Sequence, residues 1–198
     1  MRHAIARTMA AQARRRSCGL TFAVVIVGCL LAGGATAQTA RVADYEVKAA
    51  YLYNFGRFVD WPANNAASKQ ESFNVCVLGE GPIAPALEAT LAGETIGGKK
   101  VAARRIASME GLDKCQILFL SSIQEDRLQR IIEALDKNAV LTVSDMPHFS
   151  QRGGMIEFVT EGKRVRFEVN LAATRHAGLT LSSELLKVAA VVRKGPGD

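Results

Sequence analysis

The spacing of apolar residues predicts a long helix near the start of the chain, over residues 42–59. Its apolar face is formed by residues at helical spacing, namely Tyr45, Ala49, Leu52 and Val59. Asp44 and Glu46 fall in the first turn and Arg57 in the last, where they complement the helix dipole. Pro62 disfavours helical geometry at Trp61, so we expect the helix to end before it.

The middle of the chain alternates short apolar runs with segments of helical spacing. The predicted strands are 73–78, 99–107, 115–120 and 139–143. The predicted helices are 82–91 and 122–138, and the second begins with the capping-box spacing of Ser122 and Glu125. This order of strand, helix and strand favours a parallel sheet with right-handed crossovers.

The last third of the chain has a different pattern. Residues 155–160 and 163–169 alternate apolar and polar positions around Glu161-Gly162, which predicts an antiparallel hairpin. Ser182 or Ser183 then caps a final helix that continues to about residue 193. The whole pattern predicts an α/β fold, a three-layer sandwich. We expect a mixed, mainly parallel sheet, an antiparallel C-terminal hairpin and helices on both faces.

The first 37 residues have the composition of an export signal. Residues 1–16 carry five arginines and no acid, residues 20–32 are apolar, and Ala35-Thr36-Ala37 fits a signal peptidase site. We therefore predict a signal peptide over 1–37, a single domain over 38–198 and a periplasmic location. The alternative is lipid anchoring at Cys29, because Ile26-Val27-Gly28-Cys29 has the form of a lipobox. The apolar run continues past Cys29, which favours cleavage after Ala37.

Removal of the signal changes the charge of the protein. The full chain has 25 Lys+Arg and 19 Asp+Glu, a net charge of +6. All five signal arginines would leave and no acid would, so the remainder carries 20 minus 19, or +1. No basic patch with interleaved aromatic residues remains, and we expect no nucleic-acid partner.

Few residues have the spacing of a catalytic or cofactor site. Gly79-x-Gly81-x-x-Ala84 is close to a dinucleotide-binding fingerprint, but no acid ends the following strand, which favours a simple tight turn. Ser144-Asp145 and His148 resemble part of a catalytic triad, although Asp145 before Met146-Pro147 is more typical of a turn. Outside the signal the histidines are His148 and His176, and neither has ligands at metal spacing. We predict a protein that is not an enzyme, with no metal and no cofactor.

Two groups of residues are candidates for contact with a partner or ligand. The aromatic row over residues 51–61 is too dense for one buried face, so Tyr53, Phe55 or Trp61 is expected to line a pocket or an interface. The long loop 144–154 contains His148, Gln151 and Arg152, and loops on a rigid scaffold often carry recognition. A connection that merely needs glycine for its backbone is the alternative for this loop.

Cys76 and Cys115 are the two cysteines that remain after the signal. In an oxidising compartment they form either one disulfide or two buried thiols.

Three blocks of sequence, spread over most of the chain, resemble the YfiR family. They are the run from Tyr45-Glu46-Val47-Lys48 through Phe58-Val59-Asp60-Trp61-Pro62, then Arg152-Gly153-Gly154-Met155-Ile156, and finally Phe167-Glu168-Val169-Asn170 with Leu181-Ser182-Ser183-Glu184-Leu185-Leu186-Lys187. The resemblance implies a periplasmic α/β protein that forms homodimers. It also implies a repressor that binds the periplasmic sensor domain of an inner-membrane diguanylate cyclase, and that an outer-membrane lipoprotein sequesters.

The resemblance extends to one disulfide and not to a second. It implies that Cys76 and Cys115 are bonded to each other. No cysteine follows Cys115, so the loop around Ser150 must be held by something other than a disulfide. We therefore do not expect redox sensing that depends on a second bridge.

Two other functions are open on the sequence alone. The first is binding of a small molecule in a pocket near Trp61 and the strand ends. The second is an oxidoreductase that uses the glycine turn after Leu78.

Overall fold

The computed structural model describes residues 34–63, 66–121, 126–136 and 138–195, with side chains from Val42 onward. Val42–Asp198 forms one compact unit, to which the following description applies. Of the predicted signal peptide 1–37, residues 1–33, including Cys29, lie outside the described residues, as do Ser122 and Glu125.

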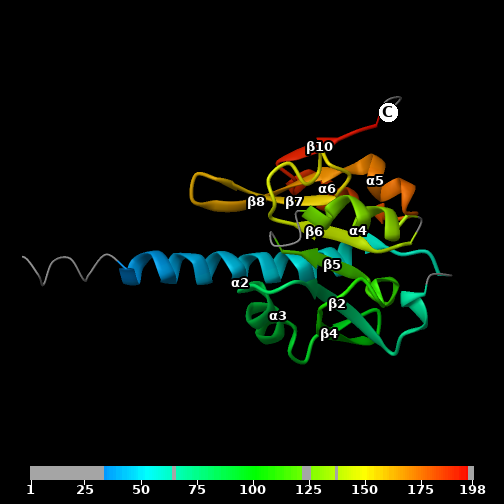
Figure 1. Cartoon of the computed structure of the whole chain (residues 1–198), viewed down its shortest axis with the longest axis horizontal. Helices are drawn as coiled ribbons and strands as arrows, with labels where there is room; N and C mark the ends of the chain where they lie inside the picture. Colours follow the sequence, from blue (N-terminus) through cyan, green and yellow to red (C-terminus); the bar gives the residue numbers. More distant parts are fainter. Residues whose placement is uncertain (1–33, 64–65, 122–125, 137, 196–198) are drawn as a thin grey trace, which may run out of the picture. The chain divides into compact units, whose positions relative to one another are not determined.

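An eight-stranded sheet forms the centre of this unit (Figure 1), in the order β10-β8-β7-β6-β5-β2-β4-β3. Its strands are β2 (Ser72–Leu78), β3 (Thr95–Ile96), β4 (Lys99–Ile106), β5 (Ile117–Leu120), β6 (Leu141–Ser144), β7 (Ile156–Glu161), β8 (Arg164–Asn170) and β10 (Val191–Arg193). The pairs β3–β4 and β7–β8 are antiparallel and the other neighbours are parallel. A separate two-stranded sheet joins β1 (Val59–Asp60) to β9 (Thr180–Leu181).

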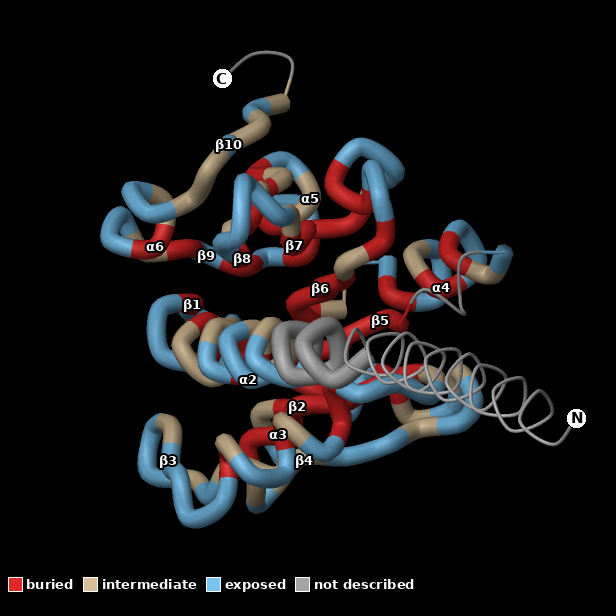
Figure 2. Tube along the Cα trace, turned by 90° about the vertical axis from the view of Figure 1, so that its left-hand side faces the viewer, coloured by how far each residue is buried: buried red, intermediate tan, exposed pale blue. Residues whose placement is uncertain are grey.

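The central strands are buried on both faces, as Figure 2 shows for β2, β5 and β6. Successive side chains of a strand point to opposite faces. Accordingly Val75 and Val77 belong to one buried cluster, while Cys76 and Leu78 belong to the other. The sheet therefore separates two hydrophobic cores.

Helices cover both cores. The helices are α2 (Gly34–Phe58), α3 (Ile83–Leu91), α4 (Leu128–Ala134), α5 (Leu171–His176) and α6 (Ser183–Val188). Buried residues of α2, α3 and α6 fill the first core, whereas those of α4 fill the second. Two short 3₁₀ helices lie at Ala67–Lys69 and Leu112–Lys114. The predicted α/β fold, with a mixed sheet and helices on both faces, is confirmed.

Three helices differ from the sequence predictions by more than two residues. Helix α2 begins at Gly34 rather than at residue 42, because residues 35–41 contain no proline or glycine to stop it. Helix α4 is shorter than predicted and ends at Ala134, whose carbonyl accepts from the Asn138 side chain. The prediction of a final helix to residue 193 is wrong beyond Val188, since Val191–Arg193 pairs with β8 as a strand.

The sequence pattern predicted no helix or strand between β8 and the last helix, but the structure has one of each. Helix α5 follows β8 directly, and the Asn170 side chain caps it by accepting from the Ala173 amide at 3.0 Å. The short strand β9 then pairs with β1 beyond the end of α2. Among the described helices, none is both long and apolar enough to cross a membrane.

Candidate functional site

Cys76 and Cys115 form a disulfide. Their Cα atoms lie 5.9 Å apart, and both residues are buried in the second core. The bond ties the middle of β2 to the residue that precedes β5 by two positions. Of the two alternatives that the cysteine count allowed, the bonded pair is confirmed.

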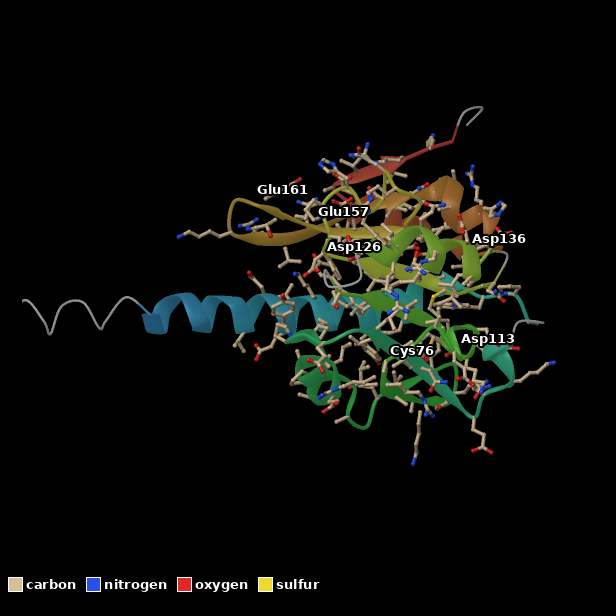
Figure 3. The ribbon with its side chains drawn as sticks, in the orientation of Figure 1. Cys76, Asp113, Asp126, Asp136, Glu157 and Glu161 are labelled. Carbon is tan, nitrogen blue, oxygen red and sulfur yellow. A yellow bond between two sulfur atoms is a disulfide. The ribbon has the colours of Figure 1, made fainter. Side chains whose placement is uncertain are left out.

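The loop between β6 and β7 is held by the buried carboxylate of Glu157, a residue of β7. Oε1 of Glu157 accepts from the His148 amide at 2.9 Å. Oε2 accepts from both the Ser150 amide at 3.0 Å and the Ser150 hydroxyl at 2.9 Å. A carboxylate this far from water is stable only with such donors. We call this arrangement the Glu157 clasp, and Figure 3 labels Glu157 beside the sheet.

A second carboxylate extends the clasp to the end of the sheet. Glu168 lies directly opposite Glu157 in the β7–β8 ladder, where two like charges would repel each other. Arg193 of β10 offsets this repulsion by donating twice to Glu168, at 2.7 and 3.2 Å. The Asn170 side chain donates to the Ser150 carbonyl at 2.8 Å. Loop, hairpin and final strand are thus joined by one polar network.

The backbone of the clasped loop has a close approach that only glycine permits. A Cβ atom added at Gly154 would lie 2.2 to 2.5 Å from three atoms of the Phe149 ring. Phe149 is fully buried, so the ring has little room to move. His148 has a φ of 61°, which is unusual for a residue other than glycine. Packing therefore requires glycine at position 154, whereas at Gly153 it is the φ of 99° that favours glycine.

The clasp places the three predicted loop residues at the surface. His148, Gln151 and Arg152 are all exposed. Below them Met146 and Phe149 are fully buried in the second core, together with the disulfide. The loop thus presents polar side chains on a support that is fixed from beneath, as recognition loops require.

Ser144, Asp145 and His148 do not form a triad. The Ser144 hydroxyl is buried and donates to the Leu120 carbonyl at 2.7 Å. Asp145 pairs instead with Lys48 of α2, at 2.6 Å. These contacts make both residues structural.

The glycine turn after β2 is poorly suited to bind a phosphate. Anions bind the free amides of a helix N-terminus. Here Pro82 and Pro85 have no amide hydrogen, and the Ala84 amide donates to the Gly81 carbonyl at 3.5 Å. Gly79 has a φ of 95°, which accounts for its glycine without a ligand. The tight-turn interpretation explains these residues.

Trp61 lies beside a pocket of about 260 Å³ next to the end of α2. Its ring packs edge-on against Phe73, with centroids 5.3 Å apart. Its indole N–H is buried and is the one buried side-chain polar atom without a partner in the described part of the chain. Lys99, also in the lining, donates to the Ser68 and Gln70 carbonyls. The pocket therefore has an aromatic wall, and polar side chains such as Lys99 complete its lining.

Tyr53 and Phe55 lie close in sequence but have different environments. A hydrogen bond to the Glu94 carboxylate raises the pKa of Tyr53 above its ordinary value of 10.0. Tyr53 is partly exposed, as a surface contact requires. Phe55 is fully buried and stacks with Tyr51 and Phe158 in the first core. Helical spacing turns it inward, so its assignment to a partner surface is wrong.

The remaining candidates form two surfaces rather than one. Trp61 and Tyr53 pack against the first core, whereas the clasped loop closes the second. The sheet lies between them. No group of three or more His, Cys, Asp or Glu residues in the described ranges is arranged to hold a metal ion.

The sequence matches the YfiR/HmsC-like family profile over residues 45–190, which is most of the chain. The chain belongs to the YfiR/HmsC-like family. This family is regulatory rather than catalytic, and its members are periplasmic.

One solved structure is similar over part of its length, a conserved domain protein from Vibrio cholerae O1 biovar El Tor. The alignment has 11% sequence identity and a TM-score of 0.46, and covers 64% of this chain and 56% of that protein. The YfiR-like chain thus spans little more than half the length of that protein. The family assignment rests on the sequence match.

Sequence reasoning missed Glu157, Glu168 and Arg193. The signal was indirect: a family loop without its second disulfide needs another support, and acids at 157 and 168 interrupt the apolar strands. The partners of Glu157 are mostly backbone amides, which carry no sequence pattern. The contacts of Glu157 therefore cannot be predicted from the sequence and are defined only by the three-dimensional position of the loop.

Proposed function

We propose that this YfiR-like protein is exported to the periplasm and represses cyclic-di-GMP synthesis there. It binds the extracytoplasmic sensor domain of an inner-membrane diguanylate cyclase and holds the enzyme inactive. It acts as a homodimer, and an outer-membrane lipoprotein releases the repression by sequestering it. Residues 1–37 are its signal peptide, and 38–198 are its single domain.

The family match over residues 45–190 is the observation that carries this proposal. Two structural features support it. The disulfide suits an oxidising compartment. The clasped loop offers exposed polar side chains on a fixed support. Such regulation needs only a coupling free energy between partner binding and the inactive state of the cyclase.

The test is binding to a purified cyclase sensor domain. The protein is exported under its own signal with a C-terminal tag, and inner-membrane proteins that bind it are solubilised and identified by mass spectrometry. Each cyclase found is then tested as a purified periplasmic domain. We expect binding to be weakened by His148→Ala with Gln151→Ala, and unaffected by the exposed control pair Lys69→Ala with Lys100→Ala. Binding of no cyclase sensor domain would refute the proposal.

The Trp61 pocket favours a second candidate function, which is small-molecule binding without a cyclase partner. The lining combines the Trp61 and Phe73 rings with the polar side chains of Ser68, Lys99 and Gln116, a mixture that is typical of small-molecule sites. A thermal-shift screen of periplasmic metabolites tests this candidate. A shift that Trp61→Phe abolishes would support it, and a flat profile would refute it.

A further inference from the structure

A groove of about 570 Å³ lies between α2, the β7–β8 hairpin and the end of α6. It is separate from both the clasp and the Trp61 pocket. In Figure 1 the hairpin projects alongside α2, and Figure 3 labels Glu161 near its tip. None of the functions proposed above uses this groove.

The floor of the groove is apolar. Val47 of α2 is 44% exposed and Val188 of α6 is 54% exposed, and both line it. Tyr51 lies between them and the core, with its ring packed edge-on against Phe167 at 5.4 Å. Single exposed valines are ordinary, but apolar side chains from two helices around one concave surface are typical of a docking site.

The rim of the groove is basic. Lys163, Arg164 and Arg166 line it, and Asp44 is the acid among the lining residues. Arg166 is held in place by Glu161 at 3.9 Å and by the Val188 carbonyl at 3.5 Å. The chain after residue 37 is almost neutral, so this concentration of positive charge is a local feature. It complements an acidic ligand.

An open strand edge completes the groove. The carbonyl of Phe167 accepts from the Ala190 amide on the β10 side, so Phe167 does not bond to β7. Backbone groups two residues apart in a strand point the same way. The N–H and C=O of Val165 therefore also face away from β7, at a point where β10 does not reach, because β10 pairs with Glu168–Asn170. Val165 lines the groove.

We propose that this groove binds an extended, acidic segment of a partner protein. Carboxylates of the segment pair with Lys163 and Arg164, its apolar side chains contact Val47 and Val188, and its backbone bonds to Val165. The inference rests on the proposed function, to which it adds a docking surface and the chemistry of the partner segment.

The lining favours a polypeptide over an anionic membrane surface. An extended chain supplies both a donor and an acceptor for Val165, as in strand addition to a sheet edge. Lipid headgroups would lie against Asp44 and would use neither backbone group. A concave site with exposed valines at its floor also fits side chains better than a flat bilayer.

The experiment uses fluorescence anisotropy to measure how tightly defined peptides bind to the whole mature protein, purified after export. The probe is a labelled twelve-residue peptide that alternates glutamate with valine or threonine, and the comparison peptide carries lysine in place of glutamate. We expect the acidic peptide to bind about tenfold or more tightly than the basic one, with a difference that falls at high salt. Equal binding of the two peptides would overturn the inference.

Matched variants locate the site. Lys163→Glu with Arg164→Glu should weaken the acidic peptide about tenfold, whereas Lys114→Glu with Arg130→Glu makes the same charge change on exposed residues elsewhere and should not. Val188→Asp should weaken binding and Val42→Asp, also exposed but outside the groove, should not. Loss of binding in the control variants overturns the inference, provided that circular dichroism shows each variant folded. Binding to phosphatidylglycerol vesicles in place of the peptide, lost in the groove variant, also overturns it.

The inference and the proposed function can fail separately. If gene deletion raises cyclic-di-GMP but the Lys163→Glu, Arg164→Glu variant restores repression fully, the groove is not the docking surface and the cyclase proposal stands. If deletion changes nothing while the groove variant loses the acidic peptide, the site stands and the cyclase proposal falls.

Discussion

The side chain of Glu157 is 6% exposed and is surrounded by donors from one loop. Removing its carboxylate leaves the His148 and Ser150 amides without an acceptor inside the protein. Leaving a buried donor without a partner lowers the free energy of unfolding by about 1 to 3 kcal/mol. The side chain thus links a single residue to the shape of the whole loop.

We predict that Glu157→Ala lowers the free energy of unfolding by about 2 to 4 kcal/mol, measured by urea titration. Glu161→Ala is the control, since Glu161 ends the same strand but is exposed, and it should change stability by less than about 0.5 kcal/mol. Equal effects of the two substitutions would mean that the clasp does not stabilise the fold.

Tyr53 gives a prediction about pH. Its hydrogen bond to Glu94 raises the pKa of the phenol, and the positive charge of Arg57 opposes this more weakly. A pKa raised on folding means that the neutral phenol stabilises the fold below pH 10, and that this stabilisation is lost as pH rises through the higher pKa. We expect Glu94→Gln to lower the pKa of Tyr53 toward 10.0. The difference in phenolate absorbance between each protein and its Tyr53→Phe partner measures it, and an unchanged pKa would contradict the assignment.

At the scale of elements, the loop between β6 and β7 depends on Gly154. Alanine there would press against the buried Phe149 ring, so we predict that Gly154→Ala destabilises the protein by about 1 to 3 kcal/mol. Gly81→Ala is the control, because no atom lies within 4 Å of the added Cβ. Similar unfolding midpoints for the two variants would refute the close approach between Gly154 and the Phe149 ring.

The disulfide gives the second prediction at this scale. It closes a loop across a sequence separation of 39 residues, which stabilises the protein by about 4 kcal/mol on the chain-entropy model. Cys76→Ala with Cys115→Ala should lower the free energy of unfolding by about that amount, measured by urea titration under oxidising conditions. A double variant as stable as the parent would show that the bond constrains nothing.

The central elements were predictable from sequence because burial on both faces leaves long apolar runs, as in β2 and β5. The end of the chain was not, because Val192 continues the helical spacing of Leu185 and Ala189, whereas the edge of β8 pairs residues 191–193 as a strand. The exposed loop residues were predictable from the glycine-rich segment. Phe55 was misassigned because a dense aromatic row does not reveal which rings turn inward.

At the scale of the whole molecule, the sheet supports separate surfaces. The clasped loop covers the second core, and the Trp61 pocket lies against the first. The basic groove beside α2 is a third.

Intracellular cyclic-di-GMP tests the central claim most directly. It is measured by mass spectrometry in the parent strain, in a deletion strain, and in the deletion strain that expresses either the parent gene or one lacking residues 1–37. We predict that deletion raises cyclic-di-GMP several-fold and that the exported protein alone restores the parent level. An unchanged level in the deletion strain, or full restoration by the form without its signal, would contradict a periplasmic repressor of a diguanylate cyclase.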